Sequence, residues 1–241
     1  SNTDLRNLSL NHNSIFGLYM RNLSVEILYS INFSNLINLR DLDLSYNSKL
    51  DLNFWTRFPM RTIRNLQKLT LTNINLTSND NIDFLNGTVS LKEIDLSNNF
   101  LRFNGSFLRQ SRAIEIIKLA NCNLRNVSKD YFNFENYFYL QFLDFSFNKI
   151  SIIQNTNLNT LRFLKTLDLS HNQIYSIDFE FQFQFLRHLN LSFNNLSEIR
   201  IIQTFEAIVI NNNQITSLKY LSGNNYMNDN SLREMPCIMI D

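Results

Sequence analysis

Residues that break regular structure are scarce in this 241-residue chain, which has only four Gly and two Pro. That scarcity excludes a collagen-like chain and a Gly/Pro-rich linker protein. No apolar run approaches the roughly 20 residues that span a bilayer, so this segment is expected to make no membrane contact itself. The net charge of +1 gives no electrostatic reason to expect a nucleic-acid partner. Two Cys are too few to settle the redox compartment.

Asparagine, in contrast, is abundant, with 39 residues, and part of it is periodic. The pattern L-x-x-L-x-L-x-x-N-x-L, with Ile or Phe in some Leu positions, recurs nine times between residues 5 and 215. The first and last copies start 200 residues apart over eight intervals, so the mean period is 25 residues. This period lies within the range of about 20 to 29 for leucine-rich repeats. The copies start at Leu5, Leu39, Leu66, Leu91, Ile114, Leu140, Leu164, Leu186 and Phe205.

Each copy combines a short strand, a turn and a variable return. The alternation in x-L-x-L-x predicts a strand whose Leu side chains face inward. Successive strands then stack into a parallel sheet that the variable halves cover on one face only. We therefore expect an α/β-type solenoid, a leucine-rich-repeat horseshoe with the sheet on its concave face and an irregular or short-helical convex side. It spans residues 1–241 as one domain of about nine to ten repeats, with terminal caps missing.

Asn at the ninth position of the pattern is expected to hold the turn after each strand. Its amide supplies a donor and an acceptor to backbone groups that would otherwise be buried unpaired. At this position the Cys122 thiol can still act as a weak donor, but Ile74 cannot. Asn73 or Asn75 is therefore expected to replace Ile74 in a locally irregular repeat. The predicted ladder consists of Asn13, Asn47, Asn99, Asn148, Asn172, Asn194 and Asn213.

Two parts of the chain fit the repeat less well. The first interval is 34 residues long, which predicts an insertion or a bulge within residues 16–38. Near the other end, Met235, Ile238 and Ile240 predict the start of a tenth strand, with a register on Leu232 and Met235 as the alternative.

An aromatic spine on the convex side is expected from Phe132, Phe179, Phe181, Phe183 and Phe185.

Four copies resemble the typical leucine-rich repeats of animal extracellular proteins, and Toll-like receptor ectodomains are the nearest group. These copies are Leu42-Asp-Leu-Ser-Tyr-Asn47, Leu143-Asp-Phe-Ser-Phe-Asn148, Leu167-Asp-Leu-Ser-His-Asn172 and Leu189-Asn-Leu-Ser-Phe-Asn194. The resemblance covers about residues 5–215 and implies a horseshoe that binds a ligand or a second receptor, with no catalysis in the repeats. The Cys-rich caps of those families are missing, so the chain is expected to be a fragment.

The leading functional hypothesis is the ligand-recognition ectodomain of a Toll-like or related receptor. It would bind a protein or microbial ligand, form a homodimer or heterodimer, and belong to a single-pass receptor of the cell surface or endosome. One alternative is a secreted or matrix adhesion protein with the same repeats. Another is an intracellular scaffold or the recognition arm of a larger enzyme such as a ubiquitin ligase. No catalytic, metal or cofactor motif occurs, so no enzyme and no cofactor are expected.

Two sets of residues on the predicted concave face are candidates for binding. Asp144 and Asp168 are adjacent like charges that could attract a cationic group, although Lys118 could form a charge-compensating ladder with Asp95 and Asp144. The second set is aromatic and is expected at outward strand positions, where it favours a protein-binding patch. Burial against a neighbouring subunit or packing among the rings themselves is the alternative. This aromatic set comprises Phe142, Phe147, His171, His188 and Phe193.

Nine Asn-x-Ser/Thr triplets, the acceptor pattern for N-glycosylation, favour a secreted glycoprotein only modestly, because chance alone gives about six at this composition. Asn190 is expected within a strand, where a glycan would obstruct a ligand. The better candidates lie outside the predicted strands: Asn22, Asn32, Asn86, Asn104 and Asn126.

Overall fold

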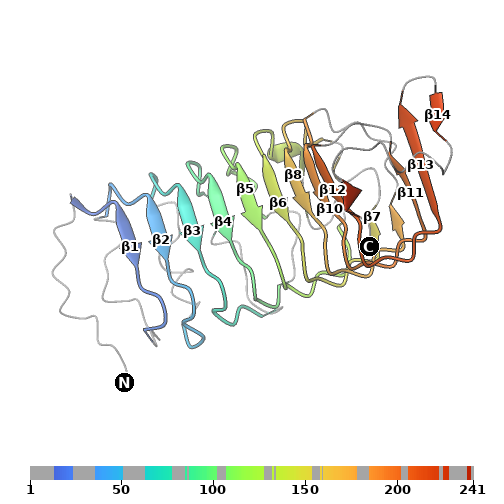
Figure 1. Cartoon of the computed structure of the whole chain (residues 1–241). Helices are drawn as coiled ribbons and strands as arrows, with labels where there is room; N and C mark the ends of the chain where they lie inside the picture. Colours follow the sequence, from blue (N-terminus) through green and yellow to red (C-terminus); the bar gives the residue numbers. More distant parts are fainter. Residues whose placement is uncertain are drawn as a thin grey trace.

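Short parallel strands lie side by side in one extended row, and their arrows point the same way (Figure 1). The computed structural model describes residues 14–23, 36–50, 63–77, 85, 87–101, 107–127, 132, 134–153, 158, 160–177, 185–201, 206–222, 225–227 and 238–239. The ten strands of the main sheet, in spatial order, are β1 Gly17–Tyr19, β2 Asp41–Asp43, β3 Lys68–Thr70, β4 Glu93–Asp95, β5 Ile116–Lys118, β6 Phe142–Asp144, β8 Thr166–Asp168, β10 His188–Asn190, β12 Ala207–Val209 and β15 Ile238–Met239.

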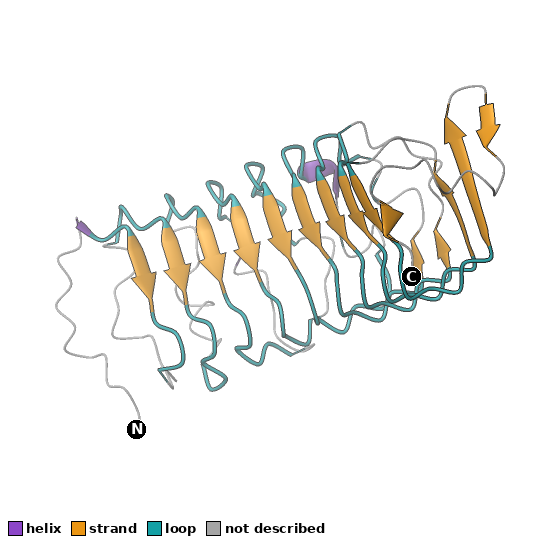
Figure 2. Cartoon of the chain, viewed as in Figure 1, coloured by secondary structure: helices purple, strands orange, loops and turns teal. Residues whose placement is uncertain are grey.

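The returning halves of the repeats are mostly irregular (Figure 2). In the described part of the chain they contain one three-residue 3-10 helix, η5 Phe134–Asn136. They also form a parallel pair from β7 Ile152–Ile153 and β9 Ser176–Ile177. A three-stranded sheet joins β11 Glu198–Ile201 and β13 Ser217–Ser222 in parallel, and β13 pairs with β14 Asn225–Met227 in antiparallel. The predicted solenoid is confirmed, with almost no helix on its returning side.

The repeat pattern determines which strand residues are buried. In the strands from β4 to β6 the central residue is buried and both neighbours are half-buried. The register places these central residues in one column, for example Ile94 opposite Ile117 and Ile117 opposite Leu143. All three are almost fully buried in a single apolar core. Burial of each such side chain stabilises the fold by about 1.5–3 kcal/mol.

The first described strand corrects the prediction of an insertion within residues 16–38. β1 pairs with β2 in register, with Leu18 opposite Leu42, so this segment contains a further strand of the repeat series. The pattern hides this repeat because Leu23 stands where the ladder Asn is expected. The copy predicted to start at Leu5 lies outside the described residues. At the other end, Ile208 pairs with Ile238 in β15, which confirms the tenth strand in the register on Ile238.

The asparagine ladder forms as predicted, and each amide joins two repeats. Asn148 Nδ2 donates to the carbonyl of Phe145 in its own repeat at 2.9 Å and to that of Leu119 in the preceding repeat at 2.8 Å. Its Oδ1 accepts the N–H groups of Cys122 and Leu124, also in the preceding repeat, at 2.9 and 3.0 Å. The same arrangement recurs at Asn47, Asn99, Asn172, Asn194 and Asn213, whereas Asn13 lies outside the described residues.

Single gaps in the ladder are tolerated because each strand-end carbonyl can be reached from two repeats. At Cys122 the thiol donates to the carbonyl of Leu96 at 3.3 Å, as expected. At Ile74 the following repeat compensates, because Asn99 donates to the carbonyl of Leu71 and accepts the Ile74 N–H. The prediction that the amide of Asn73 or Asn75 takes the place of the missing ladder amide is therefore wrong. The predicted irregularity is also wrong, because β3 continues the sheet without a break in register.

A cluster of rings fills the returning segment between β5 and β6. Phe132 is buried and lies 5.4 Å from Phe134 and from Phe145, between ring centroids. The buried Tyr137 hydroxyl donates to the Phe107 carbonyl at 2.6 Å. The predicted spine is correct for Phe132 but wrong for Phe185, which is exposed. The other three members of the spine, Phe179, Phe181 and Phe183, lie outside the described residues.

Candidate ligand-binding surface

After each strand the chain turns through a residue with a positive φ, directly before the ladder position. For an L-residue this left-handed conformation costs about 1–2 kcal/mol, and Asn adopts it most readily apart from Gly. Five of the nine residues are Asn, but four are aromatic or His, and three of those are consecutive. The column comprises Asn22, Tyr46, Asn73, Asn98, Asn121, Phe147, His171, Phe193 and Asn212, with φ between 51° and 62°.

The three consecutive rings form a continuous stack on the surface, which we call the turn stack (Phe147, His171 and Phe193). The ring centroids are 4.1 Å apart at both contacts, with interplanar angles of 8° and 10°. Backbone hydrogen bonds fix the spacing, because the N–H of Phe147 donates to the Ser170 carbonyl and that of His171 to the Ser192 carbonyl, both at 3.0 Å. Phe147 is 55% exposed and Phe193 is 45% exposed. The stack is thus a rigid aromatic surface that faces solvent.

The turn stack corrects the prediction of one aromatic patch at outward strand positions. Phe142 and His188 do lie in strands, as the first residues of β6 and β10, whereas the other three rings lie in the turns after the strands. In the described part of the chain no ring contact joins Phe142 or His188 to the stack. His188 instead approaches Glu206, with 3.7 Å between Nε2 and Oε2. The two groups are separate because β6 and β10 end at Asp144 and Asn190, before the turns that hold the stacked residues.

The aspartates of the central column have a structural role at the strand ends. Oδ1 of Asp144 accepts the N–H of Ser146 at 2.8 Å, and Oδ1 of Asp168 accepts that of Ser170 at 2.9 Å, as in an Asx turn. The predicted ladder through Lys118 is wrong, because this side chain pairs with Glu93 at 3.0 Å. Burial is the largest cause and raises the pKa of Asp144. The hydrogen bonds from Ser146 lower this pKa, and the charges of Asp168 and Asp95 raise it further, so the net shift is upward.

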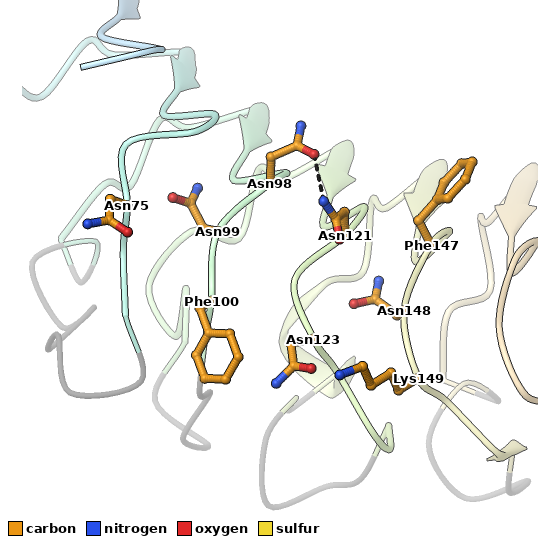
Figure 3. Close-up of a pocket in the computed structure, with 9 residues that line it drawn as sticks. All are labelled: Asn75, Asn98, Asn99, Phe100, Asn121, Asn123, Phe147, Asn148 and Lys149. Carbon is orange, nitrogen blue, oxygen red and sulfur yellow. Dashed lines mark hydrogen bonds between the residues drawn. The ribbon is translucent and has the colours of Figure 1, made fainter. Parts of the chain in front are cut away.

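A hollow of about 450 Å³ adjoins the turn stack where the column changes from Asn to Phe (Figure 3). Within its lining, Asn121 Nδ2 donates to Asn98 Oδ1 at 3.0 Å (Figure 3). The repeat pattern did not indicate this site, because its residues come from four successive repeats. The one signal in the sequence was the set of extra Asn residues beside the ladder positions. The lining consists of Asn75, Asn98, Asn99, Phe100, Asn121, Asn123, Phe147, Asn148 and Lys149.

A second exposed aromatic group precedes the strands, at the opposite end of the repeats from the turn stack. Phe163 contacts Phe138 at 5.1 Å and lies parallel to Phe185 at 5.5 Å, between ring centroids. Tyr139 packs edge-on against Phe138 at 5.2 Å. We call this set, Phe138, Tyr139, Phe163 and Phe185, the pre-strand group. Its residues lie outside the repeat consensus, so the repeat pattern did not predict it.

Exposure separates the glycosylation candidates. Asn22 and Asn126 are exposed, as are Asn75 and Asn195, whereas the candidates Asn32, Asn86 and Asn104 lie outside the described residues. Asn190 is half-buried, donates to Asp168 Oδ2 at 3.2 Å and accepts the Ser192 N–H at 3.1 Å, so its amide is already engaged.

Among the described residues, no helix has the length and hydropathy of a membrane span, and no group of three potential metal ligands occurs.

The stacked parallel strands and the amide ladder define a leucine-rich-repeat solenoid. Residues 162–205 match the family model described as Leucine Rich repeats (2 copies). Bovine osteomodulin is 28% identical over 218 residues, which are 90% of this chain and 48% of the relative. Chaoptin of Drosophila melanogaster is 26% identical over 198 residues, 75% of this chain and 14% of the relative. The chain thus spans about half the length of osteomodulin and a smaller part of chaoptin.

Solved structures share the fold at low sequence identity. The structure of the TLR13–ssRNA13 complex aligns with 78% of this chain and 30% of its own, with a TM-score of 0.61 and 23% identity. The structure of InlP from Listeria monocytogenes aligns with 94% of this chain and 61% of its own, with a TM-score of 0.64 and 19% identity. At these identities the likeness shows the fold alone.

Proposed function

We propose that this chain is the ligand-recognition part of an extracellular leucine-rich-repeat receptor of the Toll-like or a related kind, and that the turn stack contacts its partner. The turn stack is the single observation that carries this proposal. Phe in a left-handed turn costs about 1–2 kcal/mol, and Asn fills the same position more cheaply in five other repeats. An exposed aromatic surface kept at such a cost favours a binding role.

The chemistry of the turn stack suits a protein surface or a microbial ligand with an apolar part. Aromatic side chains are enriched in protein interfaces, where they bury much area at little cost in side-chain entropy. Because Phe147 and Phe193 are held by ring contacts on both sides of His171, the stack loses little further freedom when a partner binds. The exposed triplets at Asn22, Asn75, Asn126 and Asn195 are consistent with an extracellular location.

The extracellular part of this proposal is tested on protein from its natural source. Glycopeptide mass spectrometry is expected to find sugar on at least one of Asn22, Asn75 and Asn126. Absence of glycan from all the triplets would refute an extracellular location and would favour the intracellular scaffold.

The binding part is tested by changing the stack without straining its turns. In the double variant Phe147→Asn and Phe193→Asn, each turn receives the residue that other repeats use. The matched control, Phe138→Asn and Phe163→Asn, removes two exposed rings from the pre-strand group. Partners are cross-linked to the receptor on its native cells and quantified by mass spectrometry. We expect the stack variant to lose at least ten-fold of a partner that the control retains, with unchanged circular dichroism. Equal capture by both variants would refute the role of the stack.

A further inference from the structure

We infer that the hollow beside the turn stack is a saccharide-binding site. Six of its nine lining residues are Asn, two are Phe and one is Lys, and the described lining contains no carboxylate. Its volume of about 450 Å³ lies within the range of roughly 300–1,000 Å³ that is typical of small-molecule sites. A ligand that matches this lining has many neutral hydroxyl or amide groups and some apolar surface, and sugars combine these two properties.

The amides of the hollow have free capacity for such a ligand. Asn75 and Asn123 make no side-chain hydrogen bond with any residue in the described ranges, and both border the hollow (Figure 3). Asn98 and Asn121 use one atom each for their mutual hydrogen bond, which leaves Asn98 Nδ2 and Asn121 Oδ1 available. A side-chain amide presents a donor and an acceptor side by side, which is the arrangement that two neighbouring sugar hydroxyls require. Asn99, in contrast, is buried and its amide serves the ladder.

Two exposed rings supply the apolar part of the site. Phe100 is 50% exposed, and Phe147, which also ends the turn stack, is 55% exposed. The face of a phenyl ring is electron-rich, so it attracts the polarised C–H groups on one face of a pyranose. Lys149 is exposed and is the one cation in the lining, so a sugar with a carboxylate or sulfate group is also accommodated. A metal ion is disfavoured, because the lining offers no carboxylate to coordinate it.

The sugar has two possible sources with the same chemistry. Asn75 begins the triplet Asn75-Leu-Thr77 and is exposed at the hollow, so a glycan attached to its amide would start within the site. The other source is an oligosaccharide on a separate molecule. The first source rests on the proposed extracellular function, since it requires glycosylation of this chain. The second source does not.

Titration of the unglycosylated full chain with N,N′-diacetylchitobiose, the first two sugars of an N-glycan, tests the site directly. Binding is followed by the NMR shifts of the Asn side-chain amides. Asn121→Gly removes one lining amide without strain, because Gly adopts the φ of 53° readily. Asn212→Gly is the matched control, at the same turn position with a φ of 54° and outside the hollow. We expect at least ten-fold weaker binding in Asn121→Gly and wild-type binding in the control.

Phe100→Ala probes the same hollow from its apolar side and decides the outcome if Asn121→Gly fails to fold. Absence of binding to the wild-type chain, or wild-type affinity in folded Asn121→Gly or Phe100→Ala, would overturn the inference. The glycosylated chain then separates the sources. If the glycan on Asn75 fills the hollow, chitobiose binding is lost in the glycosylated chain and returns in Thr77→Ala, which removes the triplet and keeps the Asn75 amide in the lining. Equal binding by both forms assigns the site to an external sugar. Neither result depends on partner capture by the turn stack, so the two proposals can fail independently.

Discussion

Replacement of Asn99 by Leu is expected to destabilise the fold far more than the same replacement of Asn172, although both amides are buried in the ladder. Asn99 stands between the two central gaps, Ile74 and Cys122. It is the side-chain donor to the Leu71 carbonyl, at 2.8 Å, and its Oδ1 accepts two N–H groups of that repeat. Without Asn99, three buried backbone groups lose the hydrogen bonds that the structure shows for them.

Asn172, in contrast, has intact neighbours on both sides. The Phe145 carbonyl keeps the amide of Asn148, and the Leu169 carbonyl keeps that of Asn194. Only the N–H of Ile150 loses its partner. At about 1–3 kcal/mol for each buried unsatisfied group, Asn99→Leu costs at least about 3 kcal/mol and Asn172→Leu about 1–3 kcal/mol.

Urea unfolding followed by far-ultraviolet circular dichroism measures this difference, provided that the slope of free energy against urea is unchanged. We expect the Asn99→Leu midpoint to fall well below that of Asn172→Leu. A double variant, Asn172→Leu with Asn194→Leu, adds an internal check. It removes both donors to the Leu169 carbonyl, so its cost should exceed the sum of the single costs by about 1–3 kcal/mol. Equal single costs, or strict additivity in the double variant, would refute the shared-donor explanation.

The remaining predictions concern an acid, a thiol and a ring. Because burial and neighbouring carboxylates raise the pKa of Asp144, its charge destabilises the fold above that pKa but not below the ordinary value of 3.8. Asp144→Asn should gain about 0.2–1 kcal/mol in urea unfolding at pH 7 and nothing at pH 3, because Asp144 lies opposite a second carboxylate, Asp168. Asp95→Asn should gain nothing at pH 7, because the sheet neighbours of Asp95 are Thr70 and Lys118. Burial raises the pKa of Cys122 to about 12, so the reactive thiolate is scarce in the folded chain. In a Cys237→Ser background, a thiol reagent should therefore label Cys122 only after unfolding, and fast labelling of the native chain would contradict this. Phe193→Asn should change the free energy of unfolding by less than about 1 kcal/mol, because relief of the left-handed turn offsets the lost ring contact; a loss of several kcal/mol would show that the stack is structural.

The positions of the strands, and the residues that each strand buries, could be predicted from sequence because they depend only on the spacing of the apolar residues. Leu and Ile at fixed intervals determine which strand residues are buried, and the buried Asn148 is needed by any turn of this kind. The first described repeat could not be predicted in this way, because Leu23 replaces the residue on which the search depended. Its strand becomes evident only from the pairing of Leu18 with Leu42.

Side-chain positions in the turns could not be predicted from the alternation of a strand. Phe147 follows β6 by three residues, and continued alternation would turn it into the core with Leu143 and Phe145, but the strand has ended and a turn with a φ of 55° holds it in the exposed turn stack. The hollow escaped prediction for another reason. Asn75 and Lys149 are far apart in the sequence, and only the stacking of the repeats brings them to one site.

The amide ladder also gives the solenoid a direction. Each Asn reaches back: Asn194, for instance, donates to the Leu169 carbonyl and accepts the Ile174 N–H of the repeat before it. Wherever such an array of repeats stops, its two ends therefore have different needs. The leading repeat already receives its hydrogen bonds from the next one, whereas the trailing repeat has turn N–H groups with no following amide to accept them. Both ends expose an edge strand with unpaired backbone groups, but a protein or engineered segment that seals the trailing end must in addition supply acceptors for the turn N–H groups.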